Sequence, residues 1–307
     1  MRDVGGTAIM LLQAPIIGAL LALVFGMQKD AIPFWCLGAL QQLAKRAGGL
    51  GDSVGTTLDG MKPTPDHSAA IFFLVVAAVW FGTSNAAREI VSERAIYRRE
   101  RMVNLKLANY VFSKFLLLCL FCIIQCTVLL GIVFFSLGFS GGPKAFAMEL
   151  AVLIITAISS VAVGLFLSTM VDSSEAAMAL TPIALIPQVV LGGLMVPMTT
   201  NSLLEYPMFV VPARWGFQGL ITQERMAVAG APSWTMDLGK ADLSSAADFL
   251  QSGKFDCATA QLASDSITGA WGFTQYASLW IPYAVLGAMA FVTLSLILVI
   301  LKRRDSI

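Results

Sequence analysis

Charge is what this sequence has little of. Only 13% of its 307 residues are Asp, Glu, Lys or Arg, against about 25% in soluble globular domains. Hydrophobic residues make up 57% of the chain, and its mean hydropathy is +0.77. This composition excludes a soluble globular protein and predicts an integral membrane protein. We therefore expect the lipid bilayer as its surroundings and no nucleic-acid partner.

The sequence also has a single histidine and lacks a nucleotide-binding loop. His67 is the single histidine and lies outside the apolar runs, which excludes an HExxH metal site or a Ser–His pair within the membrane. The sequence has no GxxxxGK[ST] loop, so the chain cannot bind ATP by that route. We therefore expect no catalytic site, cofactor or metal in this chain.

Uncharged runs predict six membrane spans, because a helix needs roughly 20 apolar residues to cross a bilayer. The fold class is then all-α, as a single domain over residues 1–307 with long outer loops at 29–67 and 199–275. The spans are expected at about residues 4–28, 68–87, 107–138, 150–171, 176–198 and 279–301.

The uncharged cores of these spans hold no Asp, Glu, Lys, Arg or His. Ionisable residues inside the membrane usually mark proton or ion pathways and charged selectivity filters. Their absence, together with the lack of a clear inverted repeat, argues against a secondary transporter and against such a channel. If transport here is driven, its energy has to enter through a partner.

Basic residues predict the topology. They crowd the segment between the second and third spans, and Lys302, Arg303 and Arg304 follow the last span. The positive-inside rule places both segments in the cytoplasm. With six spans, both termini of this multi-pass protein are then cytoplasmic.

The segment 88–106, with the sequence REIVSERAIYRRERMVNLK, is the densest in charge. As one helix, it would be polar nearly all round, which is typical of a protein partner or a solvated surface. Two interpretations stay open: a docking element for a soluble partner, or an ordinary positive-inside loop. At 100° per residue, Glu89, Glu93 and Glu100 form one stripe, and Arg94, Arg98 and Arg101 form its neighbour.

Five cysteines carry little information. Cys119, Cys122 and Cys126 lie at helical spacing in the third span, where small apolar filler is the favoured interpretation. Cys36 and Cys257 fall in the outer loops, where either a disulfide or two free thiols is compatible with the sequence.

Two blocks of sequence resemble a known family. In the first block, the second span ends with the sequence NAAREIVSER, and the sequence AIYRRE then precedes a long third helix. In the second block, the fifth span ends with the sequence VLGGLMVPMTT, and the sequence VPARWGFQGLITQE follows it. In this order they resemble the permease half of G-subfamily ABC exporters, the white and pleiotropic drug resistance group of ABC-2 type permeases. The dense RRER sequence also resembles bacterial fusions of an ATPase to such a permease, so we expect the bacterial inner membrane.

The resemblance implies a transmembrane permease of an ATP-driven exporter, working as a homodimer or pseudo-dimer on a small or amphipathic substrate. ATP and Mg would be bound by a partner ABC ATPase domain. Residues 88–106 match the coupling helix, with Glu93 at its characteristic acidic position. The other matches are Phe81 to an aromatic facing the substrate cavity, Gly193, Leu194 and Met195 to an apolar gate, and Pro212, Arg214 and Glu224 to a re-entrant segment at 211–224.

The chain also departs from that family. Only Met1–Asp3 precede the first span, where the family has a connecting helix and, further upstream, its ATPase. We therefore expect either a fragment of an ATPase–permease fusion or a separate subunit. The rival function is a membrane scaffold that binds a cytoplasmic partner through the basic loop without transport. A neighbouring or fused P-loop ATPase would favour export.

Overall fold

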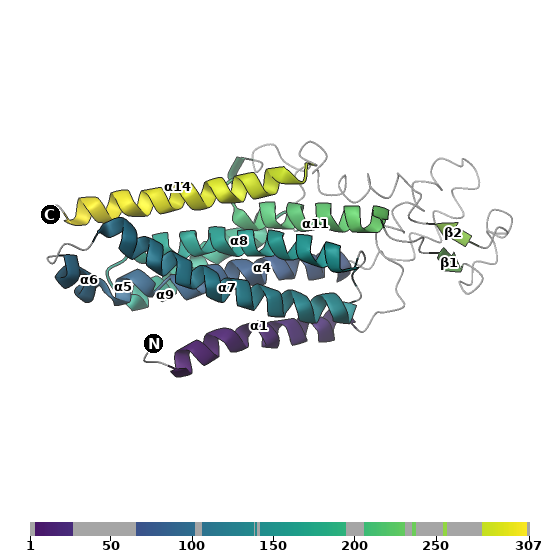
Figure 1. Ribbon diagram of the computed structural model, residues 1–307, viewed down its shortest axis with the longest axis horizontal. Helices are drawn as coiled ribbons and strands as arrows, with labels where there is room; N and C mark the ends of the chain where they lie inside the picture. The colour runs from purple at the N-terminus through teal and green to yellow at the C-terminus, as the bar shows by residue number, and fades with distance from the viewer. Residues whose placement is uncertain are drawn as a thin grey trace.

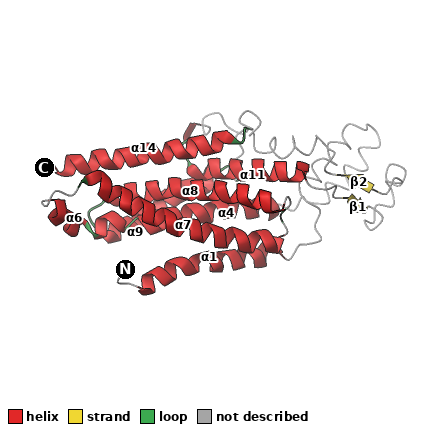
Figure 2. Cartoon of the chain, in the orientation of Figure 1, coloured by secondary structure: helices red, strands yellow, loops and turns green. Residues whose placement is uncertain are grey.

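The protein is a bundle of long helices (Figure 1). The computed structural model describes residues 4–26, 66–101, 106–137, 139, 142–194, 206–230, 235–237, 254–256 and 278–305. Nearly all of this is helix (Figure 2). The long helices are α1 (Val4–Phe25), α4 (Asp66–Ala86), α7 (Leu107–Leu137), α8 (Gly142–Met170), α9 (Ser174–Val190), α11 (Pro212–Gly230) and α14 (Trp280–Asp305); α5 (Glu89–Ser92) and α6 (Arg94–Arg101) are short.

Helix α8 is the centre of the bundle. It packs on α4, α14, α7 and α11, whereas α1 lies at the edge and packs mainly on α7. The chain runs back and forth, so that α5, α6, the start of α7, the α8–α9 turn and the end of α14 share one end (Figure 1). We call this the basic end, because it carries Lys302–Arg304. The marked N and C ends of the chain lie toward it.

The opposite, far end carries a small strand pair. Strands β1 (Thr235–Asp237) and β2 (Lys254–Asp256) pair antiparallel, with Met236 opposite Phe255. The expected all-α membrane class is confirmed, with this short ribbon as an addition. Most of the predicted outer loops, including Cys36 and Cys257, lies outside the described residues.

Five helices in the described part are long and apolar enough to cross a membrane, and α9 is a shorter apolar helix of 17 residues. The observed helices start and end near the predicted limits for the first, second, third and sixth spans. Helix α8 begins at Gly142 rather than near residue 150, so Lys144 and Glu149 belong to it. Helix α9 ends at Val190 rather than near residue 198, which leaves the fifth crossing short.

Helices α4 and α8 approach each other closely through two glycines. A Cβ built on Gly82 would lie 2.5 Å from the carbonyl oxygen of Ala157, and one on Gly164 would lie 2.6 Å from that of Thr83. Small residues of this kind let membrane helices pack backbone to backbone. The contact fixes α4, and the α5–α6 segment that follows it, against the centre of the bundle.

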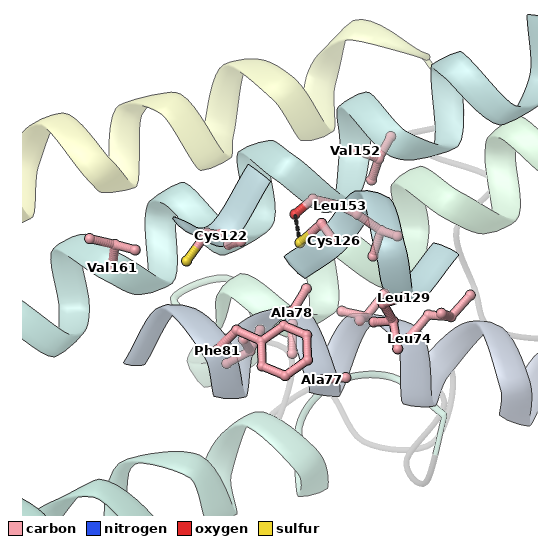
Figure 3. Packing of buried hydrophobic residues seen from close by; sticks show 14 of the residues in the cluster. Leu74, Ala77, Ala78, Phe81, Cys122, Cys126, Leu129, Val152, Leu153 and Val161 are labelled. Carbon is pink, nitrogen blue, oxygen red and sulfur yellow. Dashed lines mark hydrogen bonds between the residues drawn. The ribbon is translucent and has the colours of Figure 1, made fainter. Parts of the chain in front are cut away.

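Apolar side chains fill the space between α4, α7 and α8 (Figure 3). The thiol of Cys126 lies 4.0 Å from the carbonyl oxygen of Leu153. Cys119, Cys122 and Cys126 are buried free thiols, which fits their interpretation as small apolar filler.

A polar chain crosses the helices within this apolar core. The Asn85 amide of α4 donates to the Gln125 side-chain oxygen at 2.9 Å, and the Gln125 amide donates to the Met10 carbonyl of α1 at 2.7 Å. Both amide donors thereby find an acceptor in a medium without water. The chain ties the peripheral α1 to α4 and α7.

Candidate functional site

The segment between the second and third spans is not one continuous helix, so this part of the prediction was wrong. Helix α5 ends before Glu93, whose φ and ψ of −101° and 8° are not helical, and α6 begins at Arg94. The stripes drawn on a single helix therefore do not run across the break. Residues 102–105 lie outside the described part of the chain.

Helix α5 is held by a side chain from α8. The Ser168 hydroxyl oxygen accepts from the backbone N–H groups of Ile90 at 3.1 Å and Val91 at 3.0 Å. These are first-turn donors that have no partner within their own helix. Ser168 therefore caps α5 from outside, and the side chains of Ile90 and Val91 are buried beside it.

Two acidic residues of this segment, Glu89 and Glu93, pair with a lysine of α7. The Lys114 ammonium of α7 lies 2.9 Å from a Glu89 carboxylate oxygen and 2.6 Å from one of Glu93. Tyr97 of α6 is buried against Tyr110 of α7, with ring centroids 4.9 Å apart. Glu89 and Glu93 thus hold α5 on α7 rather than forming an outward stripe.

Asp172, in the turn between α8 and α9, joins two further elements. Its carboxylate pairs with Arg94 of α6 and lies 3.6 Å from the guanidinium of Arg304 in the last turn of α14. The α5–α6 segment is therefore tied to α7, α8 and α14 at once.

Five described residues of the α5–α6 segment are exposed. Ile96 of α6 is 48% exposed, and Arg88, Ser92, Arg99 and Glu100 of the same segment are exposed too. We call these five residues the α6 patch. Arg98 and Arg101 lie on α6, but their side chains are outside the described part.

The fifth crossing is broken into two helices that meet at mid-depth. The backbone N–H of Ala213, at the start of α11, donates to the Gln188 side chain in the last turn of α9 at 3.1 Å. Gly216 lies against Thr156, halfway along α8, and Gly219 lies against Val152, nearer the far end. Helix α9 thus lines the half nearer the basic end, and α11 continues toward the far end.

The predicted gate residues lie at this break. Gly193 has a φ of +101°, which an L side chain rarely adopts. Gly192 lies against the ring of Phe72, which also packs edge to face with Phe217 of α11, the two ring centroids being 5.4 Å apart. Leu194 is partly buried against the core, and Met195 lies outside the described residues.

Helix α11 brings polar side chains into the far half of the bundle. It starts at Pro212, which suits a first helical position, and its residues to Glu224 are buried. The Arg214 guanidinium, fully buried, lies over the rings of Phe209 and Trp215, at 4.7 and 4.0 Å from their centroids.

Glu149 is the ionisable residue that the sequence reasoning missed. It is 2% exposed in α8 and faces the Glu224 carboxyl of α11. No N–H or O–H donor in the described part of the chain reaches its two oxygens. The uncharged core predicted at 150–171 does hold no ionisable residue, but α8 begins eight residues earlier and so carries Glu149 as well. Its position directly before an uncharged run was the available signal.

Phe81, which the resemblance matches to an aromatic facing the substrate cavity, is buried within the protomer. Its side chain has 0% exposure and lies among Ala77, Ala78 and neighbouring core residues (Figure 3). A cavity between two copies of the chain would need residues at the protomer surface. On α4 the exposed aromatic residues are Phe73 and Trp80.

Within the described ranges, no group of three His, Cys, Asp or Glu side chains could hold a metal ion. Two features of the described structure remain as candidates for function. One is the α5–α6 segment, which is held to α7, α8 and α14 at the basic end. The other is the break between α9 and α11, with polar side chains on α11 beyond it.

Comparison with known proteins agrees with this architecture. The family model described as ABC-2 type transporter matches residues 1–224. The ABC transporter ATP-binding/permease protein Rv1747 of Mycobacterium tuberculosis is 32% identical over 166 residues, which cover 51% of this chain and 19% of that protein. Because the family match covers well over half of the sequence, the chain belongs to the ABC-2 type transporter family, as a membrane domain.

Proposed function

We propose that this chain forms the translocation pathway of an ATP-driven exporter, with the energy supplied by an ABC ATPase domain. The observation that carries the proposal is the break between α9 and α11. Non-helical backbone at membrane depth is tolerated only where protein covers it or where it lines a water-filled cavity. At the break, Gly192 lies against the Phe72 ring of α4, and Gly216 near the start of α11 lies against Thr156 at the middle of α8, so the break needs such surroundings.

The break also has the composition of a gate. Leu191 and Leu194 pack with the core on the side of Phe72, and Arg214 and Glu224 lie beyond on α11. An apolar constriction excludes water and polar solutes, whereas the polar residues beyond it tolerate them. A small or amphipathic substrate would leave along this column, between two copies of the chain or between this chain and a pseudo-equivalent half.

The α6 patch is the proposed contact with the ATPase domain. An exposed isoleucine among charged residues gives an apolar anchor with a polar rim, as interfaces usually have. Ser168, Lys114 and Asp172 fix the patch to α8, α7 and α14. A displacement of the patch on nucleotide binding would therefore move whole helices rather than a loose loop.

The name of the mycobacterial relative, an ATP-binding/permease protein, supports an ATPase on the same or a partner chain, and ATP and Mg would be bound there. The basic end would face the cytoplasm, in a bacterial inner membrane, by the positive-inside rule. Kinship with the G subfamily in particular is part of the same proposal and rests on the two sequence blocks.

Cysteine accessibility tests the pathway. In the full natural protein, with Cys36 and Cys257 replaced by Ser, Leu194→Cys should react with a charged, water-soluble thiol reagent, and the rate should change on adding ATP. Phe291→Cys, on the exposed face of α14, is the control: a thiol in lipid does not ionise, so it should stay unreactive. Equal inertness of both positions with and without ATP would contradict a pathway at the break.

The α6 patch is tested by Ile96→Asp, with Ile96→Leu as the matched control. The aspartate should lower substrate-stimulated ATP hydrolysis and co-purification of the ATPase domain, at unchanged membrane abundance. If both variants hydrolyse ATP and export normally, the patch is an ordinary solvated surface. A chain that binds a cytoplasmic partner but shows no ATP-dependent export would be the scaffold instead.

A further inference from the structure

A groove runs between α7 and α14 near the basic end. It has a volume of about 390 Å³, within the roughly 300–1,000 Å³ range of small-molecule sites. Both walls belong to helices long and apolar enough to cross the membrane, so the groove opens toward lipid. Phe112, on the α7 wall, is 61% exposed.

The α14 wall changes from apolar to basic toward the end of the helix. Leu294 and Leu298 line the groove, and Lys302 follows at the same spacing of four residues, which places all three on one helical face. Lys302 is exposed. Arg304, which pairs with Asp172, lies half a turn further round and is not part of this face.

The α7 wall also has a basic residue at the basic end of the bundle, although α7 starts there whereas α14 ends there. Asn109 and Ser113 line the groove, and Lys106, directly before α7, is exposed three residues before Asn109. At 1.5 Å per residue, Lys106 lies about 10 Å from Ser113 along the axis, and Lys302 lies about 12 Å from Leu294. Because the start of α7 and the end of α14 share one end of the bundle (Figure 1), the two lysines lie at similar depth.

The groove thus presents positive charge at the membrane surface and, deeper, a mainly apolar lining that includes one amide and one hydroxyl. A glycerophospholipid has matching groups: an anionic phosphate at the surface and, deeper, acyl chains joined through ester carbonyls. We propose that the α7–α14 groove is a binding site for an anionic phospholipid, with the phosphate at Lys106 and Lys302 and an acyl chain along Phe112, Leu294 and Leu298. Basic sites between membrane helices on the cytoplasmic side bind such headgroups.

Lipid retention tests the site without relying on transport. The full natural protein, purified in micelles with equal phosphatidylglycerol and phosphatidylcholine of identical chains, is analysed by native mass spectrometry. We expect preferential retention of phosphatidylglycerol. Lys106→Gln and Lys302→Gln should each lower that preference about fivefold, as expected for one basic residue near an anionic surface. Lys144→Gln, an exposed lysine at the far end of the bundle, is the charge-matched control.

A second variant tests the apolar part. Ala108→Trp, on the α7 wall, should reduce retention of both lipids, and a photoreactive acyl chain should label peptides containing Phe112 or Leu298 in the wild type only. Equal retention of the two lipids by the wild type, or no difference between the lysine variants and Lys144→Gln, overturns the headgroup assignment. Unchanged labelling in Ala108→Trp overturns the groove. Size-exclusion profiles confirm that each variant is folded.

Discussion

The contact between α4 and α8 makes a sharp prediction, because it depends on the absence of one carbon atom. In Gly82→Ala, the new methyl group would lie 2.5 Å from the Ala157 carbonyl oxygen and 2.8 Å from the backbone nitrogen of Val161. Both neighbours are backbone atoms of a central helix, so neither can rotate away. The two helices must separate by roughly 1 Å to restore an ordinary contact distance.

Two effects of opposite sign determine how much the stability of Gly82→Ala changes. Replacing a helical glycine by alanine gains about 1 kcal/mol of helix stability. Overpacking a tight interface costs about 1–3 kcal/mol, and here the separation also weakens packing along neighbouring turns of α4. We expect the second effect to dominate, with a net destabilisation of about 1–2 kcal/mol. The bonds from Ile90 and Val91 to Ser168 should weaken as α4 moves, so ATP-dependent export should fall as well.

Thermal unfolding of the purified protein measures the destabilisation, with Gly131→Ala as the control. Nothing lies within 4 Å of a Cβ built at Gly131 on α7, so that variant should be as stable as the wild type or more so. The double variant Gly82→Ala/Gly164→Ala should lose less than the sum of the single losses, because one separation relieves both clashes. If Gly82→Ala melts together with Gly131→Ala, the close packing argued for α4 and α8 is wrong.

Substitutions at three further positions follow from the site. Lys114→Met leaves the carboxylates of Glu89 and Glu93 facing each other; we expect a loss of about 1 kcal/mol in thermal stability, and a melting temperature equal to that of the wild type would count against the clamp. Glu149→Gln keeps the side-chain shape and offers a donor to Glu224, so it should be at least as stable as the wild type, whereas Glu149→Ala supplies no donor and leaves a cavity, so it should be less stable than Glu149→Gln by about 1–3 kcal/mol; equal melting temperatures of the two variants would refute the reasoning. Gly193→Val should be destabilised by about 1–2 kcal/mol, because its φ of +101° excludes a branched side chain, and Gly193→Asn should be tolerated better; reversed melting temperatures would contradict this.

Much of the architecture could be predicted from the sequence because the bilayer imposes a simple rule. An uncharged run of sufficient length becomes a helix, and most of the predicted limits agree with the structure. The rule fails where a polar residue extends a helix beyond its uncharged core. Glu149 lies in such an extension of α8, where it faces Glu224 of α11, and a count of uncharged residues ends before reaching it.

The details of the candidate site depend on contacts between distant segments, which periodicity does not contain. A helical wheel places Glu89 and Glu93 on one stripe, but only the position of Lys114 determines that the stripe faces inward. The capping of the first turn of α5 depends on Ser168, which is 77 residues away from Val91 in the chain. The burial of Phe81 depends likewise on which faces of α4 the helices α7 and α8 cover.

The bond that ties α1 to the bundle has a consequence for sequence tolerance. Gln125 donates to a backbone carbonyl, that of Met10, which any residue at position 10 would supply. The attachment of the first helix by this bond therefore does not depend on its side chains. Its exposed residues, such as Ile9, Leu12 and Ile16, can be exchanged among apolar types. A library randomised over those positions should therefore be enriched in functional variants, whereas one randomised at Asn85 and Gln125 should be depleted.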